Sequence, residues 1–325
     1  MIKRNNKKKL CLIIDVYDWA FHNIAKEIQK RYYSDIITYD LFEKKIKYGN
    51  FQYDNYDIYI YFYIKYNDVT KKKIKNYSYK KKIYYFQYEN YTWKISKKRL
   101  ISTKQKYTLI DKFFCASPNI FNDTKKNFKN ITNFGSCYDG VDEKVFKFVG
   151  YKKDYKEKEK LVIGWIGNSN IKINGRIKRF IELNDVLNEK DMKERFVFKP
   201  LDSFNKKIPH NQVPNYIENI DIIVCFSKSE GTPNQILEAS SCGKCWVSTD
   251  VGIVSLLQNT LPNNLCGLIL EKSDDIEEEK QNLKNKLNYL YENRDLMVKY
   301  GENGRKAILK KFKIDTTIKN ILSQI

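Results

Sequence analysis

The amino-acid sequence predicts an α/β protein of two domains, each built on a parallel β-sheet. Its 325 residues are enough to fill two hydrophobic cores, and 42% of them are apolar. Short apolar runs of strand length alternate with amphipathic stretches of helical period along the chain. Residues 221–252 read as strand, loop, helix, turn and strand, a unit whose two strands run parallel. Sheets of this kind bind ligands beyond the carboxyl ends of their strands.

The first half of the chain carries apolar runs that predict five strands. They cover residues 10–16, 36–39, 57–64, 83–87 and 112–116. Amphipathic helices are expected after the first strand, up to about Lys30, and from Ser117 onward. Residues 133–142 (NFGSCYDGVD) are rich in glycine and predict a loop, and the Lys- and Glu-rich stretch 147–159 predicts a linker. The first domain is therefore expected at residues 1–150.

The second half of the chain predicts a second domain at residues 151–311. Its expected strands cover residues 161–166, 196–199, 222–226, 245–249 and 267–270. A helix is expected from Pro233, which suits a first helical position, to Gly243, a natural helix stop. Two further helices are expected before residue 311, and residues 312–325 are also helical in pattern.

The net charge of +21 is concentrated in the first half of the chain. Residues 1–150 hold 31 basic and 15 acidic side chains, a net charge of +16, whereas residues 151–325 carry +5. The chain is also rich in Asn, Ile and Tyr, and an AT-rich genome favours that composition without any functional cause. The functional interpretation is attraction to an anionic membrane surface or to a polyanionic acceptor. Binding to nucleic acid is a further interpretation.

No targeting or membrane-spanning segment is expected. The first apolar run, Leu10 to Ile14, is too short for a signal peptide, and no stretch approaches 18 apolar residues. The seven cysteines form no secreted framework, and Cys242 and Cys245 spell C-x-x-C without a second pair that would complete a zinc site. The predicted location is therefore the cytoplasm. The basic first half extends this prediction to peripheral attachment at the inner face of the membrane.

Two carboxylates frame the helix of the 221–252 unit. Glu230 lies in the loop before the helix and Glu238 lies within it. A glycosidase would hold two carboxylates about 5–9.5 Å apart, whereas eight residues along a helix span about 12 Å. The spacing fits two contacts to one elongated ligand, whose anionic part lies at the helix N-terminus. The unpaired N–H groups of that first turn attract phosphate.

The same stretch resembles the donor-site signature of retaining GT-B glycosyltransferases of family 4. The matching residues are Glu230-Gly231-Thr232-Pro233, Leu237-Glu238-Ala239, Gly243 and Ser248 to Gly252. The resemblance implies two Rossmann-like domains facing each other across a cleft, with the C-terminal helix, residues 312–325, packing back on the N-terminal domain. It implies transfer of a sugar from a nucleotide diphosphate sugar, with a UDP-sugar favoured and with neither a metal nor another cofactor.

The resemblance also implies roles for single residues. Glu230 would contact the transferred sugar, and Glu238 the ribose of the nucleotide. The diphosphate would be held at the helix N-terminus by Gly231, Thr232, Pro233 and Asn234. Lys199 and His210 are further candidates, expected at the edge of the nucleotide base.

A second part of the donor site is expected after the strand at 161–166. Family members commonly carry an arginine and a lysine there, which stabilise the charge that the leaving diphosphate gains. In this chain Asn168, after Gly167, stands at the place of the arginine, and Lys178 is the best match to the lysine. Arg176 could supply the missing charge. The departure at Asn168 puts the exact phosphate clamp in question, but not the class.

The first domain matches the family only loosely. Gly140-Val141-Asp142 with Phe146 resembles the segment at the domain junction. Trp19, in a Trp-Ala-Phe segment, and Glu89 are candidate residues on the acceptor side, and Trp19 reads equally well as a core aromatic. Some family members carry a histidine near position 89. This chain has none there, so no acid–base step by histidine is predicted.

The favoured function is therefore a retaining glycosyltransferase acting on a glycan or lipid-linked acceptor in surface polysaccharide biosynthesis. Two alternatives stay open. One is an enzyme that glycosylates DNA, as some phage enzymes do, and the other is a GT-B protein that binds a sugar nucleotide without turnover. A sugar phosphorylase is less favoured, because no lysine motif marks a pyridoxal cofactor. No D-x-D arrangement flanked by a strand marks a metal-bound donor.

Overall fold

The computed structural model describes residues 8–17, 20–52, 55–62, 81–88, 110–127, 132–170 and 175–325. They form two compact units, Met1–Tyr138 with Ile318–Ile325, and Asp139–Thr317. The sequence prediction has these boundaries at residues 150 and 311. The first differs because the junction segment is bonded into the second unit. Val141 N donates to Phe312 O at 2.9 Å, and Ser241 Oγ donates to Phe146 O at 2.7 Å.

The N-terminal unit holds a six-stranded sheet within the described residues, and all of its strand pairs are parallel. The elements in chain order are β1 (Leu10–Ile14), α1 (Ala20–Gln29), β2 (Ser34–Thr38), α2 (Tyr39–Lys47), β3 (Ile58–Tyr61), β4 (Lys82–Gln87), β5 (Lys112–Cys115), α5 (Pro118–Asn127) and β6 (Phe134–Ser136). The order in the sheet is β2-β1-β3-β4-β5-β6. Every residue of β1 and β3 is buried, which is typical of parallel strands covered on both faces.

β6 is a strand where the glycine-rich sequence predicted a loop. It pairs in parallel with β5 at the edge of the sheet. Gln324, near the C-terminus, bonds this edge through both of its amide atoms: Oε1 accepts from Ser136 N at 3.0 Å, and Nε2 donates to Ser136 O at 3.2 Å. Lys112 Nζ donates to Gln324 O at 2.7 Å. The last residues of the chain therefore cover an exposed strand edge, and they stabilise a strand that local sequence does not mark.

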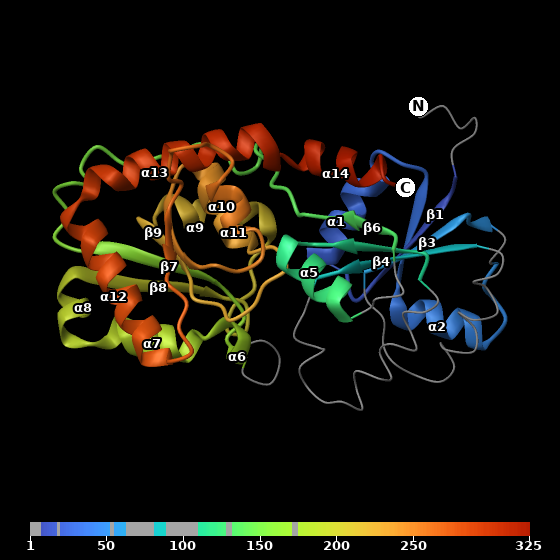
Figure 1. Cartoon of the computed structure of the whole chain (residues 1–325), viewed down its shortest axis with the longest axis horizontal. Coiled ribbons are helices and arrows are strands. Elements are labelled where there is room, and N and C mark those ends of the chain that lie inside the picture. The colour runs from blue at the N-terminus through green and yellow to red at the C-terminus, as the bar shows by residue number, and fades with distance from the viewer. Residues whose placement is uncertain are drawn as a thin grey trace. The chain divides into compact units, whose positions relative to one another are not determined.

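The C-terminal unit holds a five-stranded parallel sheet of order β11-β10-β9-β7-β8. Its elements are β7 (Leu161–Gly167), α6 (Gly175–Lys178), α7 (Phe180–Asn188), α8 (Lys190–Arg195), β8 (Phe196–Asp202), η3 (His210–Gln212), α9 (Val213–Glu218), β9 (Ile222–Cys225), α10 (Asn234–Cys242), β10 (Cys245–Thr249), α11 (Val254–Gln258), β11 (Leu268–Leu270), α12 (Ile276–Glu292), α13 (Arg294–Ala307) and η4 (Ile308–Phe312). The last helix, α14 (Ile314–Leu322), begins in this unit and ends in the N-terminal unit. α7, α8 and α12 lie on one face of the sheet, and α9, α10 and α13 lie on the other (Figure 1). The prediction of two parallel α/β domains is confirmed.

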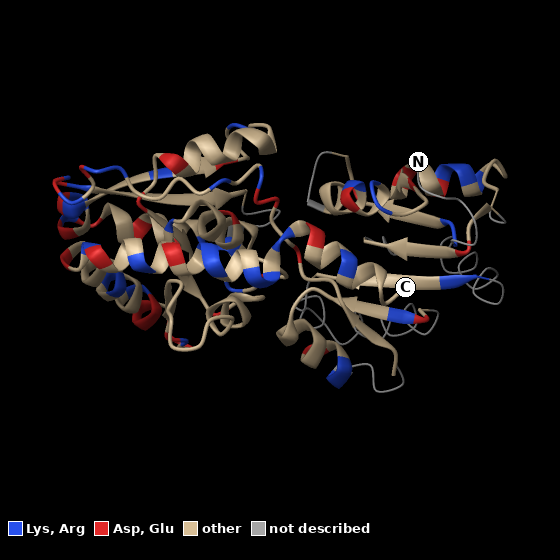
Figure 2. Ribbon diagram, turned by 90° about the horizontal axis from the view of Figure 1, so that it is seen from above, with Lys and Arg blue, Asp and Glu red and all other residues tan. Residues whose placement is uncertain are grey.

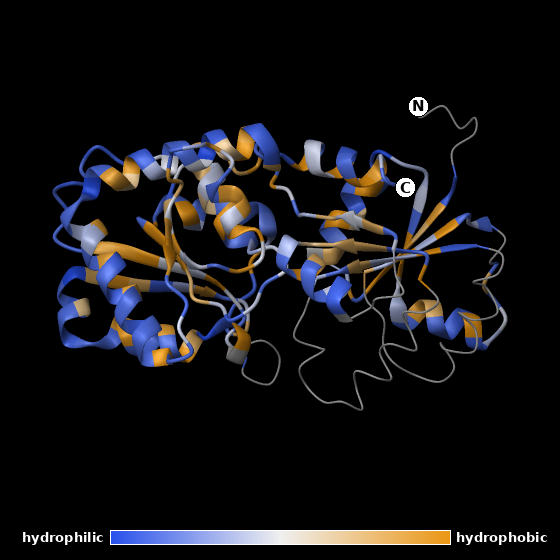
Figure 3. Cartoon of the chain, in the orientation of Figure 1, coloured by the Kyte–Doolittle hydropathy of each residue, from blue (hydrophilic) through white to orange (hydrophobic). Residues whose placement is uncertain are grey.

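The core of this unit lies between its sheet and its two helical layers. β9 is buried at all four positions. Figure 3 shows that the strands are largely apolar, whereas the outer helices carry both hydrophilic and hydrophobic residues. α10 is buried from Gln235 to Cys242, because α13 packs on it. A Cβ on Gly301 of α13 would lie 2.1 Å from Gly243 O, so only glycine permits this approach. Gly243, at φ 76°, ends α10 as the sequence predicted.

Helix ends account for part of the charge of this unit. Figure 2 shows basic and acidic residues intermixed on its helices. The first turn of α12 carries Glu277, Glu278 and Glu279, and the last turn of α13 carries Arg305 and Lys306, which complement the helix dipoles. Among the residues that the structure describes, no helix has the length and apolar content to cross a bilayer.

Lys244 is a buried cation between α10 and β10. It is 2% exposed, and its Nζ donates to Glu218 O at 3.0 Å and lies 4.8 Å from the centre of the Tyr151 ring. Burial lowers the pKa of Lys244 to about 8. An unfolded lysine titrates near pH 10.4, so the native protein disfavours the charged form.

Replacing Lys244 by methionine is therefore expected to raise the free energy of unfolding by about 1–3 kcal/mol at about pH 7. Between about pH 8 and about pH 10.4 the unfolded wild-type chain keeps the Lys244 proton and the folded protein has lost it, so the free energy of unfolding of the wild type rises with pH. The stability advantage of the variant should therefore vanish at about pH 10.4. Urea denaturation at the two ends of this pH range measures both effects, with the exposed Lys153→Met as control. Lower stability of Lys244→Met at neutral pH would contradict the prediction.

Candidate active site

The predicted donor-site residues lie at the carboxyl ends of β7 and β9, which are neighbours in the C-terminal sheet. The chain continues from β7 to β8 on one side and from β9 to β10 on the other, so the strand order reverses between β7 and β9. In open α/β sheets, ligands bind in the crevice between the loops that leave the sheet at such a point. Those loops include residues 168–170 and 226–233.

Glu230 and Lys178, the two predicted catalytic residues, are in contact. Lys178 Nζ lies 2.6 Å from Glu230 Oε1, and the two side chains are 21% and 11% exposed. Lys178 is the last residue of α6, and Lys228 N donates to Ile177 O at 2.7 Å, which fixes the end of α6 against the loop after β9. The fold thus places an ammonium group and a carboxylate side by side, partly shielded from water, at the edge of the sheet where ligands bind.

Two buried hydroxyl groups support the Glu230 carboxylate. Ser227 Oγ donates to Glu230 Oε1 at 2.6 Å, and Thr249 Oγ1 donates to Ser227 O at 2.6 Å. Ser227 and Thr249 are buried at the ends of β9 and β10. Oε1 therefore receives both the serine hydroxyl and the lysine. Among the described residues nothing bonds Oε2, so this oxygen can accept from a ligand.

Glu238, the predicted ribose contact, pairs with His210. The distance between His210 Nε2 and Glu238 Oε1 is 2.8 Å, and the carboxylate side chain is 9% exposed whereas the imidazole is 54% exposed. The hydrogen bond to Glu238 raises the pKa of His210 above its ordinary value, although burial acts in the opposite direction. The contact of His210 with the nucleotide base stays a prediction, and in the structure its side chain bonds the second glutamate of the signature.

The predicted diphosphate residues form the turn into α10. The helix starts at Asn234, one residue later than predicted, and Pro233 at its N-cap provides no side-chain cap. Pro233 O accepts from Ile236 N at 2.9 Å, so the N–H groups of Asn234 and Gln235 are those that a ligand can bond at this helix end. Thr232 Oγ1 accepts from Asp139 N at 3.4 Å, which connects this turn to the junction segment. Gly231 lies against Gly252, the last residue of the signature.

Replacing Gly252 by alanine is expected to lower the free energy of unfolding by about 2–4 kcal/mol and to weaken nucleotide binding. Gly252 has φ 60°, and its Cβ would lie 2.5 Å from Gly231 O and 2.9 Å from Pro233 Cδ, so the turn into α10 must move. Gly49→Ala is a matched control, because Gly49 has φ 73° with no atom within 4 Å of the added Cβ. It should cost only about 1–2 kcal/mol, the cost of the left-handed backbone alone. Equal losses for the two variants in urea denaturation would contradict the close approach.

In the described part of the loop after β7, Asp202 accepts hydrogen bonds from Ser169. Asn168 Oδ1 accepts from Asn170 N at 2.9 Å and closes a local turn. Ser169 Oγ donates to Asp202 Oδ2 at 2.6 Å, and Gly167 O accepts from Ser203 N at 2.9 Å. Asn168 therefore shapes this loop and brings no charge to it, so Lys178 is the cation that the described side chains place beside Glu230.

Three predicted residues cannot be placed. Arg176 belongs to α6, but its side chain lies outside the described part of the structure, and Trp19 and Glu89 lie wholly outside the described residues. The sequence reasoning missed Gln235, whose Oε1 accepts from Ile166 N at 3.0 Å and so connects α10 to the end of β7. Among the described residues its buried Nε2 has no hydrogen-bond partner. Gln235 is the second residue of the predicted phosphate-binding helix, and this position in the sequence could have identified it as a site residue.

The described part of the chain shows where the cysteines and the possible metal ligands lie. No group of three His, Cys, Asp or Glu side chains there could hold a metal ion. All seven cysteines are free and buried. Burial raises the pKa of Cys242 to about 12 and also raises that of Cys245, so both remain thiols at neutral pH. The C-x-x-C sequence is therefore part of the core.

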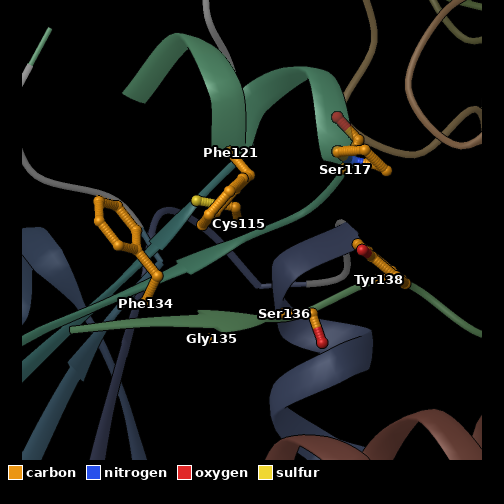
Figure 4. A pocket seen from close by; sticks show the side chains of 8 residues that line it. Cys115, Ser117, Phe121, Phe134, Gly135, Ser136 and Tyr138 are labelled. Atoms are coloured by element: carbon orange, nitrogen blue, oxygen red, sulfur yellow. The ribbon is translucent and has the colours of Figure 1, made fainter. Parts of the chain in front are cut away.

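The N-terminal unit has a cavity of about 280 Å³ beside the carboxyl end of β5 (Figure 4). It is lined by Cys115, Ser117, Pro118, Phe121, Phe134, Gly135, Ser136 and Tyr138. The rings of Phe121 and Phe134 meet edge to face at 5.2 Å on one side, and Ser117 and Tyr138 lie on the other. Aromatic faces with a few hydroxyl groups are typical of small-molecule sites.

Residues 203–307 match the family described as Glycosyl transferases group 1. The matched segment runs from the end of β8 to the end of α13 and includes both Glu230 and Glu238. A comparison with curated proteins gives no match.

Solved structures resemble nearly the whole chain at low sequence identity. Sucrose-phosphate synthase from Thermosynechococcus elongatus has a TM-score of 0.72 at 12% identity, with 98% of each chain covered. HepE from Anabaena, in complex with UDP, has 0.69 at 13% identity, covering 98% of this chain and 99% of that one. The lipopolysaccharide outer core galactosyltransferase WaaB has 0.64 at 16%, covering 97% and 98%. The chain therefore has the GT-B fold of two Rossmann-like domains, and its residues 203–307 are similar to the glycosyl transferases group 1 family.

Proposed function

We propose that the protein is a glycosyltransferase that moves a sugar from a nucleotide diphosphate sugar with retention of anomeric configuration. The observation that carries this proposal is the pairing of Lys178 with Glu230 next to the turn into α10. The similarity to a group 1 domain covers Glu230 and that turn. A UDP-sugar is the favoured donor, because the similar Anabaena protein was solved with UDP and with UDP-glucose.

The donor diphosphate would bind at the N-terminus of α10. As the bond to the sugar breaks, the leaving diphosphate gains negative charge, which the Lys178 ammonium and the first N–H groups of α10 would stabilise. The buried Nε2 of Gln235, which has no hydrogen-bond partner among the described residues, supports the same placement. Such a donor costs about 1–3 kcal/mol when unsatisfied, and a phosphate oxygen would satisfy it. These cationic and N–H groups can do the work of a metal ion, so we propose a metal-independent reaction without a cofactor.

The two glutamates would hold the two ends of the donor. Glu230 is fixed by Ser227 and Lys178 through Oε1, which leaves Oε2 for hydroxyl groups of the transferred sugar. Glu238 is held by His210 through Oε1, which leaves Oε2 for the ribose. Carboxylates recognise hydroxyl groups well because an ionised acceptor roughly doubles the strength of a hydrogen bond.

The N-terminal unit would bind the acceptor, a glycan or a lipid-linked sugar of surface polysaccharide biosynthesis. Its cavity between α5 and β6 supports this, because Phe121, Tyr138 and Ser117 provide apolar faces and hydroxyl groups for a sugar ring. The name of one similar structure, a lipopolysaccharide outer core galactosyltransferase, points to the same class of acceptor. The net charge of +16 in residues 1–150 would favour an acceptor at an anionic membrane surface.

Donor consumption followed by proton NMR tests this proposal. The protein is incubated with each common UDP-sugar and with glycan or lipid-linked acceptors, with and without a chelator. We expect one donor to be consumed, with the anomeric configuration kept in the product and the rate unchanged by the chelator. Binding of a donor without consumption in the presence of any acceptor would favour a sugar-nucleotide-binding protein. Transfer onto duplex DNA would favour the nucleic-acid alternative.

A further inference from the structure

The two side chains of the contact between His210 and Glu238 differ in their exposure to solvent. Glu238 is an interior position of α10, and only 9% of its side chain is exposed, whereas His210 enters from η3 with 54% of its side chain exposed. The distance of 2.8 Å is that of a hydrogen bond between a ring nitrogen and a carboxylate. A poorly solvated carboxylate thus has a titratable partner that is in contact with water.

The surroundings of His210 favour its cationic form. Asp142, in the junction segment, adds a second negative charge whose field acts on the imidazole, and the Phe146 ring centre lies 5.1 Å from that of His210. On α10 itself, Cys242 stays neutral because burial raises the pKa of its thiol. Arg305 of α13 donates to the backbone oxygen of Phe146 at 3.0 Å. Two carboxylates therefore face the imidazole, and the hydrogen bond with Glu238 is the stronger of the two influences.

We propose that His210 is a positioning residue for the donor: as an imidazolium it fixes Glu238 and neutralises its charge, so that Glu238 Oε2 can accept from a vicinal diol of a nucleoside diphosphate. This inference rests on the proposed function, since it assigns the ribose to Glu238. It adds a residue from outside the matched signature and makes donor affinity depend on pH.

Electrostatics give the direction of that dependence. With His210 protonated, the pair has no net charge, and the dianionic diphosphate meets no added repulsion at this end of the site. When His210 loses its proton, Glu238 keeps its negative charge, and the site repels the donor more strongly. Because the pKa of His210 is raised, donor affinity should be constant in the acidic range and fall as the pH rises through that pKa.

Histidine NMR tests the ion pair without any assumption about function. The chain has two histidines, and His22 is buried in the N-terminal unit, so the single variant His22→Gln assigns both signals. We expect His210 to titrate above the ordinary histidine value of about 6.5 and Glu238→Gln to move it back toward that value. A titration near the ordinary value that Glu238→Gln leaves unchanged would overturn the pairing.

UDP calorimetry from about pH 5.5 to about pH 9 tests the positioning role. Relative to His210→Gln, we expect wild-type affinity to fall about three- to tenfold across this range, which corresponds to a coupling of about half to one pKa unit. His210→Gln keeps a hydrogen-bond donor but cannot titrate, so it should show only the pH dependence that the terminal phosphate of UDP causes, and its affinity should be close to the wild-type value at the alkaline end. His210→Ala should bind UDP more weakly than His210→Gln. His22→Gln should behave as wild type.

In turnover assays, His210→Gln should raise the donor KM and leave kcat unchanged, because the imidazole touches neither the transferred sugar nor the leaving group. The same pH profile in wild type and His210→Gln would overturn the inference while the donor site stands. Absence of UDP binding at every pH would overturn the proposed function and this inference with it. The NMR titration then shows whether the ion pair itself was correct.

Discussion

Glu230→Gln is expected to lower sugar transfer about 100- to 1000-fold, the loss typical of removing one positioned electrostatic group from a catalytic site. The amide has the shape of the carboxylate and can still accept the Ser227 hydroxyl, but it lacks the charge that pairs with Lys178 and that the reacting sugar would meet. UDP should bind within about twofold of wild type, because no nucleotide contact is lost. Initial rates and calorimetry measure the two quantities, and Glu230→Ala should show the same separation.

The matched control for this variant is Glu194→Gln, which changes an exposed carboxylate of α8 in the same way. It should leave both turnover and UDP binding unchanged. Turnover of Glu230→Gln within about twofold of wild type would exclude Glu230 from the reaction.

Lys178→Met is expected to lower kcat at least about 100-fold, because the leaving diphosphate loses the ammonium group that stabilises its growing charge. The variant also leaves Glu230, 11% exposed, without its cation, so stability should fall too. Combining it with Glu230→Gln separates the two effects. The double variant removes both charges and should recover stability while turnover stays low.

Lys190→Met, at the exposed start of α8, is the control for a lost lysine charge. A double variant that recovers turnover together with stability would mean that Lys178 and Glu230 form an ion pair with no catalytic part. Urea denaturation and steady-state kinetics on the same preparations decide between these outcomes.

The organisation of the C-terminal domain could be predicted because its signals are local. The buried run at β9, the uncapped start of α10 and Gly243 at its end each follow from residues close in sequence. The sequence also indicated that Lys178 and Glu230 lie at the same edge of the sheet, because parallel strands bring their carboxyl ends together there. Strand order decides which loops meet there, and the resemblance to a known family supplied the residues.

Features that depend on distant partners could not be predicted. β6 forms because Gln324 bonds Ser136 from the far end of the chain, while its own sequence reads as a glycine-rich loop. The contact between His210 and Glu238 was not predicted, because the sequence does not show that η3 brings His210 onto α10. Asn168 stands at the place of the family's arginine, and the sequence does not show that its side chain closes a turn with Asn170. In each case the deciding contact is a specific hydrogen bond that no periodicity encodes.

The most direct test of the donor site is calorimetric titration with UDP of the wild type and of Glu238→Ala. We expect micromolar binding by the wild type and a loss of about tenfold or more in the variant, because a buried carboxylate that accepts from a diol contributes at least about 1.4 kcal/mol. Titration with GDP, ADP and CDP shows whether uracil is the preferred base. Equal UDP affinity in the two proteins, or no binding of any nucleotide by the wild type, would contradict the assignment of this site to a sugar-nucleotide donor.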